Sequence, residues 1–189
     1  MTCEDIFRRI DAHIIRGLIY HEQMADYFDF LNLHGYKRLH ECRYLEESAA
    51  MRGLHRYYIN HYDELLPSSG IENPNAIPAN WYGHMRADVT AAEKKEYIKR
   101  AFDSWVKWEK ETKKLYQSAY CDLCDIGEVA AACKVKQLLE DADQELKKAN
   151  RMRLSLDMVN YDLSTIYLCQ DEIHEVYRAR EKDIGVDIC

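Results

Sequence analysis

The sequence predicts an all-helical protein, and three features of its composition and pattern lead to this fold class. Its 189 residues include only 7 Gly and 3 Pro, too few for the frequent turns of a sandwich or a barrel. Hydrophobic residues make up 47% of the chain and aromatic residues 11%, which is enough for a packed core and too much for a disordered chain. Apolar residues recur at steps of three and four along most of the chain, as on one face of a helix. We therefore expect a single helical domain over residues 1–189.

The first part of the chain predicts two helices joined by a short turn. Thr2 is followed by acidic residues and is a suitable N-cap, and the apolar pattern then continues to about Leu33. Gly35 is the expected turn residue. The second helix is predicted over residues 36–66, because Pro67 cannot continue it. The short turn makes these two helices antiparallel neighbours.

Residues 67–89 form the one long connection and contain all three prolines. A connection of this length in a compact domain is usually a crossover between elements or a functional loop. Thr90 and Glu93 have the spacing of a capping box, so a third helix should begin there and continue to about Cys124. Residues 125–127 end in glycine and provide a second short turn.

The last third of the chain predicts two more helices, because residues 128–183 contain no Gly or Pro. Two apolar stripes are separated by the polar stretch 149–155. We predict a fourth helix that ends near Arg153 and a fifth over residues 156–182; one continuous helix is the alternative. Two short turns and one long connection predict a four-helix bundle, about residues 4–153, made of two antiparallel hairpins joined by a crossover.

The fifth predicted helix has an apolar stripe of its own, which runs from Leu156 to Tyr177. Four helices already close a core, so this stripe must pack across the bundle or against a second chain. We therefore expect a homo-oligomer, in the form of a dimer. A different protein partner is the alternative.

Charge and hydropathy exclude several classes of function. The formal net charge is −7, which disfavours binding to nucleic acid. No stretch of about 18 apolar residues occurs, so we expect no membrane span. The first residues lack the basic and apolar parts of a secretion signal, so we expect a cytoplasmic protein.

Seven cysteines in such a chain are expected to be reduced thiols. Cys121 and Cys124 form a CxxC pair, and Cys133 is the nearest further thiol. A zinc site needs four ligands, and no second pair follows nearby, so the role of this pair stays open.

Two stretches of the sequence resemble proteins of the ferritin-like superfamily. The segment 26–47, DYFDFLNLHGYKRLHECRYLEE, resembles the first-hairpin turn of bacterioferritins and of the DNA-protecting mini-ferritins. The segment 108–146 is similar to the second hairpin of bacterioferritins. The resemblance implies a bundle that buries a di-iron carboxylate site, with iron oxidation or storage as its activity and a cage or a dimer as its assembly.

The same resemblance implies ligand positions, most of which lack a ligand in this sequence. The family site takes one Glu from each of two helices and a Glu-x-x-His from each of the other two. When the turn at Gly35 is aligned with that of the family, the expected ligands fall at Gly17, Ala50 and Gly53. On the fourth helix the nearest match is Glu140-x-x-Asp143, with aspartate in place of histidine.

Five residues remain candidates for a reduced or shifted site for iron or another divalent metal. Glu47 and Glu109 interrupt apolar stripes, and His21 does so on the first helix, at the level of Glu47. A buried carboxylate is costly unless it is paired or bound to metal. Glu22 and His55 are possible additional ligands. The competing interpretation is a hydrogen-bonded His21–Glu47 or Tyr–Glu pair in a tyrosine-rich core.

A second candidate site comes from the mini-ferritin resemblance alone. In that family, His and acidic residues near the first turn bind iron between subunits, and His34, His40 and His55 resemble such a set. Two functions therefore compete. The ligand count favours a degenerate, non-catalytic bundle that acts through self-association or a partner surface. The alternative is a metal-binding protein and, if it is an enzyme, a ferroxidase-like di-metal carboxylate oxidase.

Overall fold

The computed structural model describes residues 1–67 and 89–187, with side chains to Ile184. Within these ranges the chain forms five helices and no strand, which confirms the predicted fold class. The helices are α1 (Cys3–Phe30), α2 (His34–Tyr62), α3 (Ala91–Asp125), α4 (Val129–Met158) and α5 (Leu163–Asp187).

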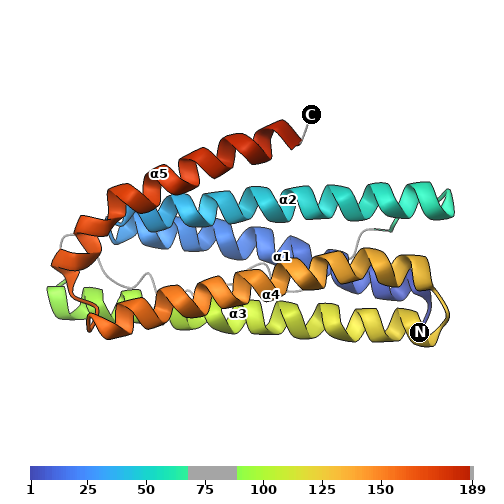
Figure 1. Cartoon of the computed structure of the whole chain (residues 1–189), viewed down its shortest axis with the longest axis horizontal. Coiled ribbons are helices and arrows are strands. Elements are labelled where there is room, and N and C mark those ends of the chain that lie inside the picture. Colours follow the sequence, from blue (N-terminus) through green and yellow to red (C-terminus); the bar gives the residue numbers. More distant parts are fainter. Residues whose placement is uncertain (68–88, 188–189) are drawn as a thin grey trace.

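The first four helices form two antiparallel hairpins, α1–α2 and α3–α4, that lie side by side (Figure 1). Helix α2 ends and α3 begins at opposite ends of the bundle, so these two helices run in the same direction. The connection between them has to cross the length of the bundle, as predicted. Residues 68–88, which make up nearly all of the predicted long loop, lie outside the described residues.

The two predicted helix caps are present. The Thr2 hydroxyl accepts a hydrogen bond from the Asp5 backbone N–H at 3.1 Å, and the Asp5 carboxylate accepts one from the Thr2 N–H at 2.9 Å. Thr90 and Glu93 make the same reciprocal pair at the start of α3. Each cap satisfies backbone N–H groups that the helix itself leaves unpaired, and so it fixes the residue at which the helix begins.

The prediction of Gly35 as the first turn is wrong, because Gly35 lies inside the first turn of α2. The chain reverses three residues earlier, at Asn32, which has a φ of 59°. Gly35 is glycine for another reason: a Cβ atom there would lie 2.5 Å from the backbone oxygen of Gln170 on α5. The Gly35 N–H also donates to the Gln170 side-chain oxygen at 3.2 Å. The glycine therefore allows α5 to contact α2 closely.

Two predicted helix ends also need correction. Helix α2 ends at Tyr62 rather than Leu66, because Asp63 adopts a left-handed conformation with φ 55°. Helix α4 continues through the polar stretch 149–155 to Met158. That stretch has no helix breaker, and its polar side chains lie on the outer surface, where Arg153 pairs with Asp103 of α3 at 3.0 Å.

The chain turns between α4 and α5 at Asn160 and Tyr161, whose φ values are 48° and 50°. Tyr161 is buried beneath this turn. The fifth helix thus begins seven residues later than predicted, at Leu163 instead of 156, and ends at Asp187 instead of 182. The alternative of one continuous helix over both segments is wrong.

The core has two apolar clusters, one toward each end of the bundle. One contains Tyr20, Phe28, Phe102 and Trp105, and the other contains Ile10 and similar residues of the four helices. In each of the first four helices the residues that separate the two clusters include small or polar residues that are buried: Gly17 on α1, Arg43 and Glu47 on α2, Glu109 and Thr112 on α3, and Glu145 on α4. A buried polar layer therefore crosses the middle of the bundle.

Helix α5 lies along α2 on the outside of the bundle (Figure 1). Its inner face buries Ile166 and Tyr177, and Arg38 of α2 pairs with Glu181 at 2.9 Å. Of the two alternatives for the predicted stripe, packing across the bundle or against a second chain, the structure shows the first, because Leu156, Ile166 and Tyr177 are buried within this chain. Its outer face leaves Leu168 83% exposed and Val176 57% exposed.

We expect Gly35→Ala to destabilise the protein by about 1–3 kcal/mol, because the new methyl group would overlap the α5 backbone. Gly53→Ala is the matched control on the same helix. A Cβ there meets only the flexible Lys134 ammonium at 3.9 Å, so this variant should gain up to about 1 kcal/mol from helix propensity. Urea unfolding of both variants measures the difference, and equal effects would show that the α2–α5 contact is not tight.

Candidate functional site

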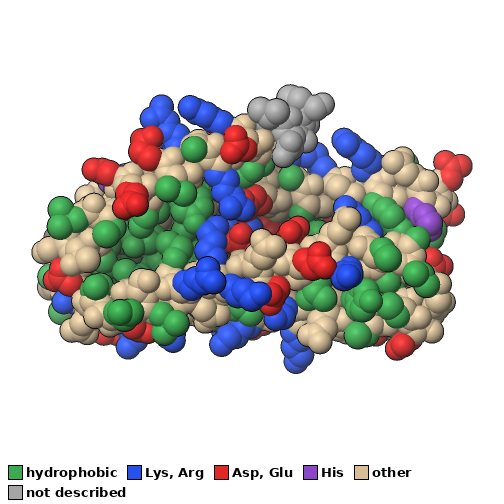
Figure 2. Space-filling view, in the orientation of Figure 1, with side chains coloured by type: hydrophobic (Ala, Val, Ile, Leu, Met, Phe, Trp, Pro, Cys, Tyr) green, Lys and Arg blue, Asp and Glu red, His purple; other side chains and the backbone are tan. Residues whose placement is uncertain are grey.

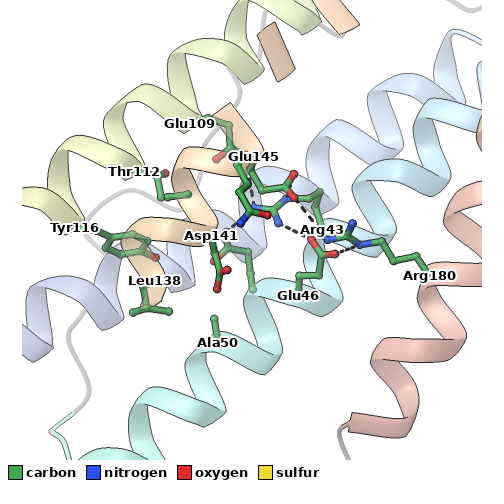
Figure 3. A pocket seen from close by; sticks show the side chains of 13 residues that line it. Arg43, Glu46, Ala50, Glu109, Thr112, Tyr116, Leu138, Asp141, Glu145 and Arg180 are labelled. Carbon is green, nitrogen blue, oxygen red and sulfur yellow. Dashed lines mark hydrogen bonds and ion pairs between the residues drawn. The ribbon is translucent and has the colours of Figure 1, made fainter. Parts of the chain in front are cut away.

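The buried polar layer is centred on Arg43 of α2, which is 8% exposed (Figure 3). Its guanidinium lies within ion-pair distance of four carboxylates: Glu46 at 2.5 Å, Glu47 at 3.4 Å, Glu109 at 3.7 Å and Glu145 at 3.7 Å. A guanidinium presents five N–H donors in a plane, which suits several carboxylates around its rim. One side chain thereby connects α2, α3 and α4.

Helix geometry explains why these groups meet. Glu46 and Glu47 follow Arg43 by three and four residues, so they lie one turn farther along the same face of α2. Glu109 is held from its own helix, because Trp105 one turn earlier donates its indole N–H to Glu109 Oε1 at 2.9 Å. The other oxygen, Glu109 Oε2, is buried and has no hydrogen-bond partner among the described residues.

A cavity of about 240 Å³ adjoins the guanidinium. Its apolar wall consists of Ala50, Leu138 and Ala142, and its polar wall includes the hydroxyl-bearing residues Thr112 and Tyr116 (Figure 3). The charged residues that line it are Glu46, Glu47, Glu109, Asp141 and Glu145 against Arg43 and Arg180. The lining therefore carries more carboxylates than cations.

Helix α5 contributes to this site through Arg180. The Arg180 guanidinium pairs with Glu46 and lies 3.6 Å from Glu145, which are two of the carboxylates that Arg43 also contacts. Lys148 adds a further contact to Glu145 at 3.2 Å. Charged side chains accordingly gather over the middle of the face shown in Figure 2. The fifth helix is thus tied to the buried layer.

Burial, together with the neighbouring charges, shifts the pKa values of these carboxylates. Burial raises the pKa of Glu47 to about 7 although Arg43 opposes this, and the neighbouring Glu109 and Glu46 raise it further. Burial also raises the pKa of Glu109. Burial would likewise raise the pKa of Glu145, but Arg43, Lys148 and Arg180 together lower it. Glu145 is therefore the carboxylate that these cations hold ionised, while Glu47 takes up a proton near neutral pH.

Of the five metal-ligand candidates, the structure brings two together. Glu47 and Glu109 are both buried and line the same cavity. Glu22 is exposed on α1. His55 bonds Asp11 at 2.6 Å and is not among the residues that line the cavity.

The predicted His21–Glu47 pair is wrong. His21 Nδ1 lies 2.9 Å from His40 Nδ1, so one ring donates to the other, and both rings are buried. Burial and the nearby Arg43 lower the pKa of His40 to about 3, and burial and His40 lower that of His21. The two histidines form a neutral hydrogen-bonded pair in the core, next to the charged layer.

The second candidate site is not assembled on one surface. His34 is exposed and bonds Asp171 of α5 at 3.1 Å, whereas His40 is buried with His21. His55 bonds Asp11 on α1. The three histidines that the mini-ferritin resemblance grouped together thus have separate partners.

Sequence reasoning missed Arg43 and Glu145. The apolar period of α4 predicts that Leu139 and Leu146 face inward, but the helix is rotated so that Leu138 and Glu145 are buried and these two leucines are only partly buried. The sequence signal that could have identified Arg43 is its spacing of three and four residues from two glutamates, one of which interrupts an apolar stripe. Glu140 is exposed, and Asp143 lies at the edge of the core, where it pairs with Lys113 at 2.5 Å.

Comparison of the sequence with protein-family models and with curated proteins gives no match. Among solved structures, the chain is similar to an engineered closed form of the ferritin of Archaeoglobus fulgidus, with a TM-score of 0.72 and 16% identity over 91% of this chain and 93% of that one. A humanized archaeal ferritin and the open-pore ferritin of Archaeoglobus fulgidus each give a TM-score of 0.71 at 16% identity, over 91% and 94% of the two chains. The chain therefore has the ferritin-like fold that its resemblance predicted.

The residues of the buried layer do not fit a di-metal centre. In the described part of the chain, no group of three or more His, Cys, Asp or Glu side chains is arranged to hold a metal ion. Two of the three positions aligned with ligands carry no ligating group: Gly53 has no side chain, and Ala50 contributes only a methyl group to the wall of the cavity. At the third, a Cβ on Gly17 would lie 3.3 Å from the Glu47 carboxyl carbon. The guanidinium lies among the carboxylates that a metal would need.

We expect Glu47→Gln to stabilise the protein more at pH 8 than at pH 5. Because the folded-state pKa of Glu47 is raised to about 7, its protonation favours the native state at low pH, and this contribution is lost as the pH rises through 7. The neutral glutamine avoids that loss, so the difference in unfolding free energy between variant and wild type should grow by up to about 3 kcal/mol between these pH values.

Urea unfolding at the two pH values measures this difference. Glu140→Gln, on the exposed face of α4, is the control and should change little with pH. A Glu47→Gln variant that is less stable at pH 8 than at pH 5, relative to wild type, would show instead that ionised Glu47 is a required partner of Arg43.

Proposed function

We propose that this chain is a ferritin-like bundle without a di-metal centre, and that it acts by self-association rather than by metal catalysis. The observation that carries the proposal is the position of Arg43. Its guanidinium lies among Glu46, Glu47, Glu109 and Glu145. A cation already held there by covalent attachment pairs with the carboxylates that would otherwise bind metal.

Self-association is supported by the outer face of α5. Leu168 and Val176 are exposed there, and an apolar hollow of about 340 Å³ lies between α4 and α5, with Leu156, Ile166 and Ile173 in its lining. The hollow is visible as a green depression on the face in Figure 2. Exposed apolar surface of this kind is typical of contact between chains. We propose a second copy of this chain as the partner, in a homodimer.

We propose the cytoplasm as the location of the protein. The six cysteines in the described part of the chain are unpaired, and Cys121, Cys124 and Cys133 are exposed, which suits a reducing compartment. None of the described helices is long and apolar enough to cross a membrane.

Metal content tests the first half of the proposal. Protein purified without chelator should contain substoichiometric iron, manganese and zinc by elemental analysis, and it should not oxidise iron(II) above the rate in buffer. Near-stoichiometric metal that is lost in Glu47→Ala and in Glu109→Ala would contradict the proposal.

That contrary result would favour the alternative function, a protein with a reduced carboxylate site for iron or another divalent metal and ferroxidase-like activity. The observation in favour of this alternative is that Glu47 and Glu109 line one cavity, whose carboxylates outnumber its cations. His21, Glu22 and His55 would have to leave their present surroundings to join that site, which weighs against it.

Light scattering tests the second half. We expect the wild-type chain to have the mass of a dimer and Leu168→Glu to have the mass of a monomer, because a charge on the outer face of α5 would oppose contact between apolar surfaces. Leu65→Glu is the matched control, since Leu65 is 78% exposed but follows the end of α2. A wild-type monomer, or dimers of both variants, would exclude α5 as the interface.

A further inference from the structure

We propose that Arg43 is the resident cation of a carboxylate cage beside this cavity, and that the cage binds a free guanidinium-type cation once this side chain is removed. The cage consists of the carboxylates of Glu46, Glu47, Glu109 and Glu145. The inference rests on the proposed absence of a di-metal centre and deepens it, because it names the group that takes the place of a bound ion.

The first argument is contact. The Arg43 guanidinium meets carboxylates from three helices, at distances between 2.5 and 3.7 Å. Its two terminal nitrogens donate hydrogen bonds to Glu46 at 2.5 Å and to Glu47 at 3.4 Å, while its Nε atom is buried without a hydrogen bond to any described residue, 3.7 Å from Glu145. The group is therefore held by two hydrogen bonds and, in addition, by the charge of Glu109 and Glu145 from other sides.

The second argument is charge balance. Five carboxylates and two guanidinium groups line the cavity, so the lining is already acidic when Arg43 is present. Without Arg43, the carboxylates of Glu47 and Glu109 would face each other with no cation between them. A buried ion pair that loses one partner is strongly destabilised, because the other charge stays buried and unpaired. At pH values at which Glu47 and Glu109 are ionised, the cage thus requires a cation at this point.

The third argument is that the other arginine cannot serve in its place. Arg180 contacts Glu46 and Glu145, but its side chain is 47% exposed and approaches from α5 at the outer side of the cage. Neither Glu47 nor Glu109 has Arg180 as a partner in a described ion pair. Arg180 therefore provides a matched control, an arginine on the same carboxylates that is not the buried cation.

Chemical complementation of Arg43→Ala tests the proposal. Methylguanidinium has the charge and planar donors of the missing group, and methylurea has nearly the same shape without the charge. In chelator-treated buffer, millimolar methylguanidinium should raise the melting temperature of Arg43→Ala by several degrees in a saturable manner. Methylurea should not, and neither wild type nor Arg180→Ala should respond to methylguanidinium.

Three results of this experiment would contradict the proposal. If methylguanidinium does not raise the melting temperature of Arg43→Ala, or if methylurea raises it as much, the cage is not a cation site. An equal rise in wild type would show that the ion acts elsewhere on the protein.

A pair of variants decides the question if Arg43→Ala does not fold. Arg43→Met leaves the cage with its full set of carboxylates, and Arg43→Met with Glu109→Gln removes one of them while the glutamine oxygen can still accept from Trp105. The double variant should recover soluble, cooperatively melting protein that Arg43→Met lacks. The proposal is wrong if Arg43→Met is as stable as wild type, or if the second substitution brings no recovery.

These results can be separated from those that test the absence of metal. Metal bound to wild type would overturn the proposed function, whatever Arg43→Ala does. A metal-free wild type together with a failed complementation would leave the proposed function standing and remove only the role of Arg43.

Discussion

The contact between the Arg43 guanidinium and four carboxylates is the interaction on which the interior of this bundle depends. Three helices contribute to it, and each apolar cluster of the core lies to one side of it. Burial of Glu47 and Glu109 is costly in an apolar interior, and the guanidinium offsets part of that cost. The middle of the bundle is consequently polar, although the fold is one in which the resemblance implied a metal centre.

The small residues around this layer are consistent with the same arrangement. Gly17 leaves room for the Glu47 carboxyl group, and Ala50 forms part of a cavity wall. Larger ligating side chains at these positions would compete with the guanidinium for space and for carboxylate oxygens. Small residues at the aligned ligand positions and a buried arginine therefore belong to the same arrangement. The Arg43 guanidinium takes the place among the carboxylates that a bound metal ion would have.

Helix α5 is connected to the layer by charge and to α2 by close packing. Arg180 shares Glu46 and Glu145 with Arg43, while Gly35 permits the backbone of α5 to approach α2. The fifth helix therefore has one face committed to its own chain and one face, with Leu168, available for contact with another. Different residues of the same helix thus contact the polar layer and contribute to the proposed dimer surface.

The sequence by itself determined the helices, their order and the crossover, because apolar period, capping boxes and the distribution of Pro and Gly are local signals. It also identified Glu47 and Glu109 as buried, since each interrupts an apolar stripe. Only the tertiary structure decided that Gly35 serves the α5 contact, that His21 pairs with His40, and that Arg43 and Glu145 face the interior. Periodicity gives the apolar face of a helix to within about one residue position. A long guanidinium one position from that face can point inward or outward, and the carboxylates of the other helices determine which.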